Sequence, residues 1–244
     1  TGVLNGDFCH IFFDDRIVIS DFCLTLHIQR YVKTMKTKQE IVENWLPRYT
    51  NHPLEDFGEY ILLTNFNNYV DIFCEHFALE KPDYKSNMRM ATAGNLTIIN
   101  FGMGSPNAAI VMDLLSAIRP KACLFLGKCG GLSRKSQRGD LILPLAGIRG
   151  EGTSNDYFPP EVPALPAFML QRAVSSTIRD MGLDYWTGTV FTTNRRVREH
   201  DEDFLANTRG TPNSLATKQA MPIPEASMVS TLVIGLPAKR RRNS

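Results

Sequence analysis

The first of two glycine-rich segments has the residue types of a turn that could bind an anion. Gly102 and Gly104 follow a strand-like run at 96–101, and Ser105 followed by Pro106 is typical of a helix start. Glycine permits a tight turn, serine is a preferred helix cap, and proline is favoured at the first helical position. The N–H groups of such a helix start favour negative charge. This segment therefore predicts one wall of a pocket for a phosphorylated sugar or a nucleotide.

The second glycine-rich segment follows the strand-like run 122–126. It consists of Gly127, Lys128, Cys129, Gly130 and Gly131. If the two runs are neighbouring parallel strands, both segments form loops at the same carboxyl edge of the sheet, and together they predict a cleft. Lys128 is then either an anion contact or a solvated side chain. Cys129 fits a small packed residue better than a nucleophile, because no histidine nearby in the sequence would lower its pKa.

A dinucleotide-binding fingerprint is the main alternative interpretation of the first segment. Asn107 stands where the pattern G-x-G-x-x-G/A requires a small residue. The strand-like run 122–126 also ends without the acidic residue that would bind a ribose hydroxyl. The sequence therefore argues against a dinucleotide, and we expect no cofactor.

The elements that must hold these segments alternate between strand-like and helix-like runs. The strand-like runs are 60–64, 96–101, 122–126, 140–145 and 187–192, and the helix-like runs are 36–46, 65–77, 106–118 and one through Leu170, Val174, Ile178 and Met181 that Gly182 can end. Residues 78–95 are expected to form a polar loop, and Pro47 should end the first helix. Such alternation favours parallel pairing through crossovers. The sequence therefore predicts an α/β fold with a mostly parallel or mixed central sheet flanked by helices.

Composition limits the partners and the compartment. The chain has 244 residues, 43% of them hydrophobic, and a net charge of +2, but residues 204–244 hold six Lys or Arg against the single acid Glu225. The remainder is net acidic, so we expect no nucleic-acid surface. Charged residues interrupt the apolar stretch 11–28, which predicts neither a signal peptide nor a membrane span. The five cysteines lack metal-ligand spacing, and we expect a cytoplasmic protein without a metal.

Longer motifs give the chain a family resemblance. Gly130 and Gly131 are followed by GDLILP at 139–144, IRGEGTS at 148–154 and Tyr157, in an order that resembles the nucleoside phosphorylase superfamily. The runs LLTNF at 62–66, NFGMG at 100–104 and TGTVFTT at 187–193 resemble the AMP nucleosidases, most closely their short bacterial form. The resemblance covers about residues 35–204 and implies a nucleoside-phosphorylase-like fold.

The resemblance implies hydrolysis of AMP to adenine and ribose 5-phosphate, and a homo-oligomer that is a hexamer in the family. The implied substrate contacts are Gly102, Gly104, Ser105 and Asn107 on the sugar side, Gly127 to Gly131 on the sugar and phosphate side, and Phe191, Thr192, Thr193 and Asn194 at the base. Arg149, Arg195 and Arg196 are candidates for the 5′-phosphate, because a guanidinium matches phosphate geometry. Each of the three could instead be a solvated or ion-paired surface residue.

Two alternatives to hydrolysis stay open. A phosphorylase of this fold needs a basic residue beside the second glycine segment to hold inorganic phosphate, whereas Phe125 stands at that place. The absence of that charge favours water as the nucleophile. The second alternative is an inactive nucleotide-binding or assembly subunit, since the carboxylates that the family uses at the ribose and the base have no counterpart after residue 204.

The family pattern stops after Asp203. The resemblance implies a later strand ending in Met-Glu and another ending in Ser-Asp, and neither motif occurs in 205–244, so the catalytic residues stay unassigned. This part is rich in Ser, Thr, Pro and Asn and carries four consecutive basic residues at 239–242, which is typical of a disordered extension or an out-of-frame translation rather than of sheet strands. We therefore expect a leader or extension at 1–34, an α/β nucleotide-binding domain at 35–203, and an atypical tail at 204–244.

Overall fold

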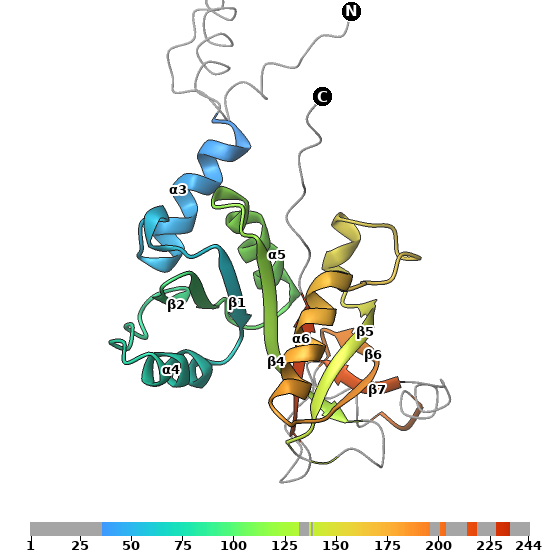
Figure 1. Ribbon diagram of the computed structural model, residues 1–244. Coiled ribbons are helices and arrows are strands. Elements are labelled where there is room, and N and C mark those ends of the chain that lie inside the picture. Colours follow the sequence, from blue (N-terminus) through green and yellow to red (C-terminus); the bar gives the residue numbers. More distant parts are fainter. Residues whose placement is uncertain are drawn as a thin grey trace, which may run out of the picture. The chain divides into compact units, whose positions relative to one another are not determined.

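The computed structural model describes residues 36–131, 137, 139–195, 201–203, 214–218 and 228–234 (Figure 1). The chain divides into two units, Thr1–Ile41 and Val42–Ser244. The expected leader at 1–34 lies outside the described residues. Within the described part, no helix has the length and apolar character needed to cross a membrane.

Helix α3 spans Lys38–Thr50. It begins with a capping box, in which the Thr37 N–H donates to Glu40 Oε2 at 2.7 Å and the Glu40 N–H donates to Thr37 Oγ1 at 3.2 Å. Pro47 was expected to end this helix, and that expectation is wrong. Proline removes one backbone hydrogen bond, but the helix continues to Thr50, whose hydroxyl donates to the Leu46 carbonyl at 2.9 Å.

The strands form one mixed sheet in the order β2-β3-β1-β4-β7-β6-β5-β8, with a further pairing of β4 and β8. The strands are β1 (Tyr60–Thr64), β2 (Arg89–Ala93), β3 (Leu96–Asn100), β4 (Ala122–Gly131), β5 (Leu141–Gly150), β6 (Tyr185–Thr193), β7 (Ser214–Lys218) and β8 (Met228–Ile234). Pairing is parallel between β1 and both β3 and β4, and antiparallel between β2 and β3. This arrangement confirms the predicted α/β class with a mixed central sheet.

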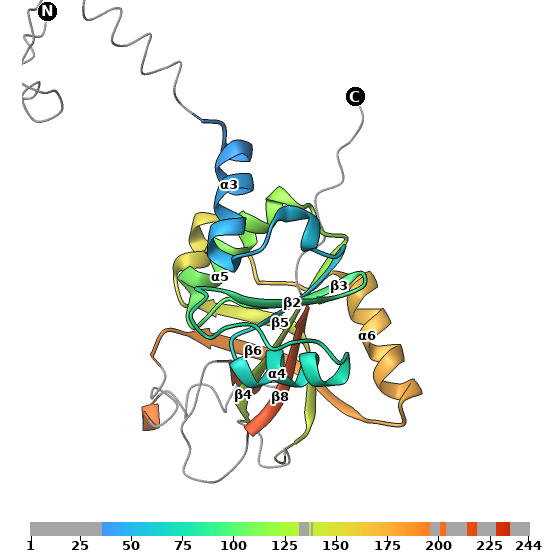
Figure 2. The same cartoon turned by 90° about the vertical axis from the view of Figure 1, so that its left-hand side faces the viewer.

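Helices and short 3-10 turns connect the strands (Figures 1 and 2). The helices are α4 (Asn67–His76), α5 (Ser105–Leu114) and α6 (Phe168–Asp180), and the 3-10 turns are η1 (Leu54–Asp56), η2 (Leu115–Ala117) and η3 (Thr153–Asp156). Helix α6 ends at Asp180, two residues before the predicted terminator Gly182, which has a φ of +70° and whose N–H donates to the Arg179 carbonyl at 2.9 Å.

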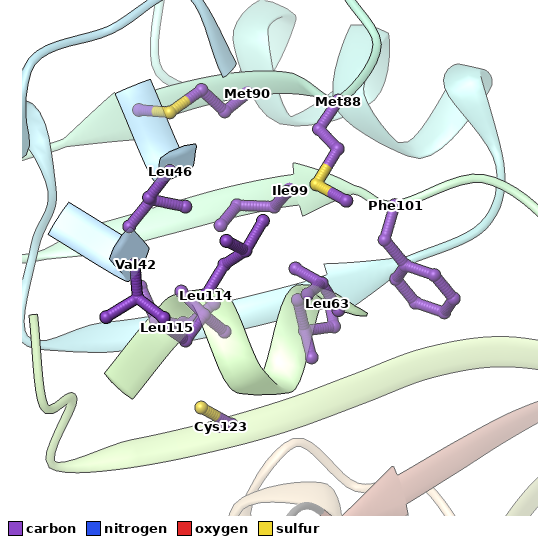
Figure 3. Close-up of a cluster of buried hydrophobic side chains, with 12 residues drawn as sticks. Val42, Leu46, Leu63, Met88, Met90, Ile99, Phe101, Leu114, Leu115 and Cys123 are labelled. Atoms are coloured by element: carbon purple, nitrogen blue, oxygen red, sulfur yellow. The ribbon is translucent and has the colours of Figure 1, made fainter. Parts of the chain in front are cut away.

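Alternating side chains of β2 and β3 build two cores on opposite faces of the sheet. Met90 and Ile99 lie in one cluster with side chains from α3 and α5, which Figure 3 shows together with Leu46, Leu114 and Leu115. Ala91 and Ile98 lie in the other cluster with Val70, Phe73 and Cys74 from α4. Side chains of adjacent strand residues point to opposite faces, so each strand contributes to both layers.

Two strand expectations need correction. Residues 78–95 were expected to be a loop, but they contain β2, which pairs with β3 along its full length. The second glycine segment, 127–131, was expected to be a loop and is instead the second half of β4. Pairing explains the difference, because 127–130 align with β8 and 129–131 with β7. A glycine-rich run therefore stays extended where neighbouring strands form hydrogen bonds with its backbone.

The tail also differs from expectation, since β7 and β8 are sheet strands within 204–244. The β8 sequence MVSTLVI contains four β-branched residues, a composition that favours strands. The Ser, Thr and Pro content of the whole tail concealed this local signal.

Candidate functional site

The first glycine segment forms a tight turn between β3 and α5. Gly102 and Gly104 have φ values of +82° and +101°, a region that favours glycine. Gly104 is the residue before the first helical position, so the predicted cap, Ser105, is displaced by one position. The Gly102 N–H donates to Asn100 Oδ1 at 2.9 Å, and this N–H is therefore not available to a ligand.

Ser105 connects this turn to two distant segments. Its hydroxyl lies 3.0 Å from Thr153 Oγ1 in η3 and donates to Asn194 Oδ1 at 3.2 Å, just after β6. Asn194 in turn donates from Nδ2 to the Glu151 carbonyl at 2.5 Å. The structure therefore brings together Ser105 and Asn194, which the sequence analysis predicted in the same site although 89 positions separate them.

Glu151 and Tyr157 hold the segment that carries Thr153. The Glu151 carboxylate accepts from the Ser154 N–H at 3.1 Å and also from the Ser154 hydroxyl. The Tyr157 hydroxyl donates to Asp113 Oδ2 of α5 at 3.4 Å, and burial together with the Asp113 charge raises the pKa of Tyr157. Glu151 therefore holds the turn together, and Tyr157 connects it to α5.

The two glycine segments lie at the same sheet edge but not on neighbouring strands. In the parallel register, Thr64 of β1 pairs with both Asn100 of β3 and Leu126 of β4. Strand β1 therefore lies between the two segments, which places them roughly 10 Å apart, or two strand spacings. The two segments begin at the same level of the parallel strands, but the second continues as a paired strand and not as the predicted loop, and the predicted adjacency of the two strands is wrong.

Asn65 occupies the gap between them, because it follows Thr64 on the central strand. Its Oδ1 atom is buried and has no hydrogen-bond partner among the described residues. Leaving a buried acceptor unsatisfied costs free energy, and such atoms often mark places that a ligand or water fills. Sequence reasoning used Asn65 only as part of a motif and did not assign it to the site.

Lys128 lies over an aromatic pair at the start of α4. Its Nζ is 4.6 Å from the centre of the Phe66 ring and 5.4 Å from that of Tyr69. A cation in this position is attracted by the π faces. Lys128 is half-buried, whereas Cys129 is fully buried and packs with Ile142 and Val190. The side chain of Cys129 thus has the packed position expected from the sequence.

The candidate phosphate-binding arginines have different surroundings. Arg149 donates from Nη2 to Asn155 Oδ1 at 2.8 Å and to the carbonyls of Phe158 and Pro159 at 2.9 Å. Its Nε and Nη1 atoms are buried without a partner among the described residues. Arg195 forms an exposed ion pair with Asp201 at 3.4 Å. Arg196 lies outside the described residues.

The order of the elements and the motifs of this site agree with a known family. Residues 59–216 match the Phosphorylase superfamily. The chain belongs to this superfamily. The match includes β1 to β6 and with them all described residues of the site.

Comparison with individual members of the Phosphorylase superfamily confirms the resemblance to AMP nucleosidases. The crystal structure of AMP nucleosidase from Bacteroides thetaiotaomicron VPI-5482 has 52% sequence identity and a TM-score of 0.73, over 81% of this chain and 89% of that chain. AMP nucleosidase from Escherichia coli K12 is 27% identical over 62% of this chain, which spans only 40% of the length of that protein. Uridine phosphorylase from Vibrio fischeri ES114, with 19% identity over 76% of this chain and 82% of that chain and a TM-score of 0.60, shares the fold.

A buried ion pair lies beside the first glycine turn, and the sequence analysis did not predict it. Arg89 is only 2% exposed, and its Nη2 lies 2.9 Å from Asp71 Oδ1. Tyr84 donates its hydroxyl to Asp71 Oδ2 at 2.7 Å. The available signal was the run NMRMATAG, in which Met88 and Met90 flank a single arginine. We had assigned this run to a polar loop, where an arginine is unremarkable.

The Asp71 pKa leads to a prediction about acid stability. Partial burial by itself would raise the pKa of this carboxyl, but hydrogen bonds from Arg89 and Tyr84 and the Arg89 charge outweigh it, so the pKa lies below its ordinary value of 3.8. A lowered folded-state pKa stabilises the protein above the unfolded-state pKa, and that contribution disappears as the pH falls through the folded-state pKa. The difference in unfolding free energy between wild type and Asp71→Asn should therefore be constant near neutral pH and shrink below about pH 4. Urea unfolding over a pH series measures it, and a difference that grows toward low pH would contradict this expectation.

Proposed function

We propose that this chain hydrolyses the N-glycosidic bond of AMP, producing adenine and ribose 5-phosphate. The observation that carries the proposal is the 52% identity to the Bacteroides thetaiotaomicron AMP nucleosidase over 89% of that chain. One water molecule adds to the sugar carbon as the bond to the base breaks, and the base leaves with a proton. The site must therefore hold the sugar and the base apart from each other while water approaches the sugar.

The residues divide this task by their position. Gly102 and Gly104 in the turn, and Ser105 at the start of α5, would contact the sugar. Asn194, which Ser105 contacts at 3.2 Å, follows the predicted base-binding run Phe191 to Thr193 on β6. Asn65 offers a buried unpaired acceptor between the glycine segments, suited to a ribose hydroxyl. Of these side chains, Ser105 and Asn194 are in direct contact across the site.

Phe125 supports water rather than phosphate as the nucleophile. Its ring lies 5.6 Å from that of Phe101 and fills the space beside Gly127, where an added Cβ would lie 2.8 Å from the ring. An aromatic ring offers no charge to hold inorganic phosphate. Lys128, the nearest cation in sequence, is held over Phe66 and Tyr69.

Two of the candidate arginines for the 5′-phosphate, Arg149 and Arg195, lie among the described residues. The unpaired Nε and Nη1 atoms of Arg149 could each donate a hydrogen bond to a phosphate oxygen, although its third nitrogen already donates to the 155–159 segment. Arg195 is exposed, and its ion pair with Asp201 is a weak surface contact that a phosphate could replace. Assembly into a homo-oligomer, which rests on the family resemblance, and a cytoplasmic location, which rests on the scattered cysteines, belong to the same proposal.

Incubation with AMP in phosphate-free buffer tests the function. We expect adenine and ribose 5-phosphate in equal amounts, measured by chromatography, with a rate that added inorganic phosphate does not increase. Ser105→Ala should lower kcat/KM by about tenfold, the value of one lost hydrogen bond. Ser116→Ala is the matched control, since this serine lies beyond the other end of α5 and donates to the Asp113 carbonyl at 2.6 Å.

Two other outcomes would replace the proposal. If the chain required inorganic phosphate and released ribose 1-phosphate from a nucleoside, it would be a phosphorylase. The absence of the family's Met-Glu and Ser-Asp motifs after residue 204 favours a nucleotide-binding subunit as the second candidate. AMP that raises the melting temperature without being consumed would identify that function.

A further inference from the structure

The buried Arg89 side chain lies on the α4 face of the sheet, opposite the larger core. Met88 and Met90, its neighbours in sequence, both point into the cluster shown in Figure 3. Arg89 therefore points the other way, as does its direct cross-strand partner Asn100, which lies between the core residues Ile99 and Phe101. This alternation places a cation and an amide side by side under the start of α4.

The guanidinium is held on three sides. Its Nε and Nη2 donate to the Pro82 carbonyl at 3.2 and 2.9 Å, Nη2 also contacts Asp71, and the plane lies 3.7 Å from the centre of the Tyr84 ring. A planar guanidinium with bonds in several directions has little freedom to rotate. Its remaining nitrogen, Nη1, is thereby aimed at the first residue of α4, Asn67, whose Oδ1 it contacts at 3.2 Å.

Two asparagines connect Arg89 to the glycine turn. Asn67 Oδ1 accepts a second hydrogen bond from Asn100 Nδ2 at 2.6 Å. Asn100 Oδ1 then accepts from the Gly102 N–H at 2.9 Å. The path from a buried cation to the ligand-facing turn therefore consists of three consecutive hydrogen bonds.

Chemistry at the two ends fixes the orientation of both amides. Arg89 can only donate, so Asn67 must present its oxygen. Asn100 must then present its NH₂ group to that oxygen, which leaves its own oxygen for the Gly102 N–H, another group that can only donate. A flip of either amide would place two donors or two acceptors against each other. The charge of Arg89 thus determines which way the Asn100 amide faces.

We propose that Arg89 is a positioning residue that acts through Asn67 and Asn100 to hold the Gly102 N–H, and with it the glycine turn that contacts the sugar of the nucleotide. The geometry of this relay is independent of the reaction, whereas its effect on substrate rests on the proposed function. The relay also explains why the Gly102 N–H, although it lies at the site, serves the protein and not the ligand.

Two substitutions at Asn67 separate the relay from general stability. Asn67→Asp retains an oxygen that accepts from both Arg89 and Asn100, so the KM for AMP should stay within about twofold of wild type. Asn67→Leu has a similar volume and no acceptor, so KM should rise by about tenfold or more, with a smaller change in kcat. Asn67→Ser, which suits a helix start but is too short to bridge, serves if the leucine variant does not fold.

A second measurement needs no substrate. Hydrogen exchange of the Gly102 amide should be faster by about tenfold or more in Asn67→Leu and unchanged in Asn67→Asp. Unchanged exchange in the leucine and serine variants would overturn the relay. Faster exchange with an unchanged KM in the leucine variant would overturn the link of the relay to substrate, whether or not kcat also falls.

Failure of the proposed function gives a different pattern. If wild type releases no adenine, AMP hydrolysis is excluded, but amide exchange in the three variants still decides whether the relay exists.

Discussion

Asp71→Ala should reduce the free energy of unfolding by about 3–5 kcal/mol, because it leaves the charge of Arg89 buried without a counter-ion. Arg89 is 2% exposed and has the Asp71 carboxylate as its ion-pair partner at 2.9 Å. The guanidinium is buried and loses its counter-ion, and the Tyr84 hydroxyl also loses its acceptor. Urea unfolding at neutral pH, followed by circular dichroism, measures the change.

The matched control lies on the same helix. Glu75 forms an ion pair with Lys81 at 2.6 Å, but the two side chains are 63% and 48% exposed. Exposed pairs contribute little because water screens them and both side chains lose rotamer freedom. Glu75→Ala should therefore have a far smaller effect than Asp71→Ala. Equal losses in the two variants would show that burial of Arg89 does not govern the stability of this region.

Gly150→Ala should destabilise the chain by about 3 kcal/mol, at the upper end for an overpacked site, and should strongly reduce adenine release. A Cβ at this position would lie 2.5 Å from Phe191 Cζ and 2.7 Å from the Thr192 carbonyl oxygen. The ring could rotate away, but the carbonyl belongs to the paired strand β6 and cannot. The added methyl group must therefore separate the ends of β5 and β6 and displace Phe191 from the proposed base-binding run. Thermal unfolding and the adenine assay measure the two effects.

A double-mutant cycle with Phe191→Ala tests the cause. Removing the ring eliminates two of the three close contacts, so Gly150→Ala should cost less in the Phe191→Ala background than in wild type. The remaining cost then reports the contact with the Thr192 carbonyl. An identical cost in both backgrounds would exclude the ring as the source of the clash.

Local sequence patterns predicted the elements that depend on neighbours along the chain. The run at 60–64 is β1 with the same bounds, and the helix through Leu170, Val174 and Ile178 is α6. A short apolar run suffices for β1 and one apolar stripe for α6, because both signals lie within the segment itself. These sequence patterns failed where the pairing of distant segments determines whether a strand forms. The strand β2 and the second half of β4 form because partner strands bond their backbones, which composition does not reveal.

The candidate site divides in the same way. The sequence predicted the glycine turn at 102–104, and through resemblance it placed Ser105 and Asn194 in one site, where their side chains make contact. It did not predict the contact between Ser105 and Thr153, nor the buried acceptor of Asn65. These features depend on the order of strands across the sheet, and one sequence does not state that order.

By itself, the sequence determined the α/β class, the superfamily motifs and the glycine positions, since these follow from backbone freedom and from the spacing of apolar residues. Only the tertiary structure decided that β1 separates the two glycine segments and that Lys128 lies over aromatic rings. It also decided that Arg89 is a buried cation connected to Gly102 through two amides. The physical reason is that the ionic and hydrogen-bonding role of a side chain depends on the groups that folding brings within about 3 Å, and those groups come from distant parts of the chain.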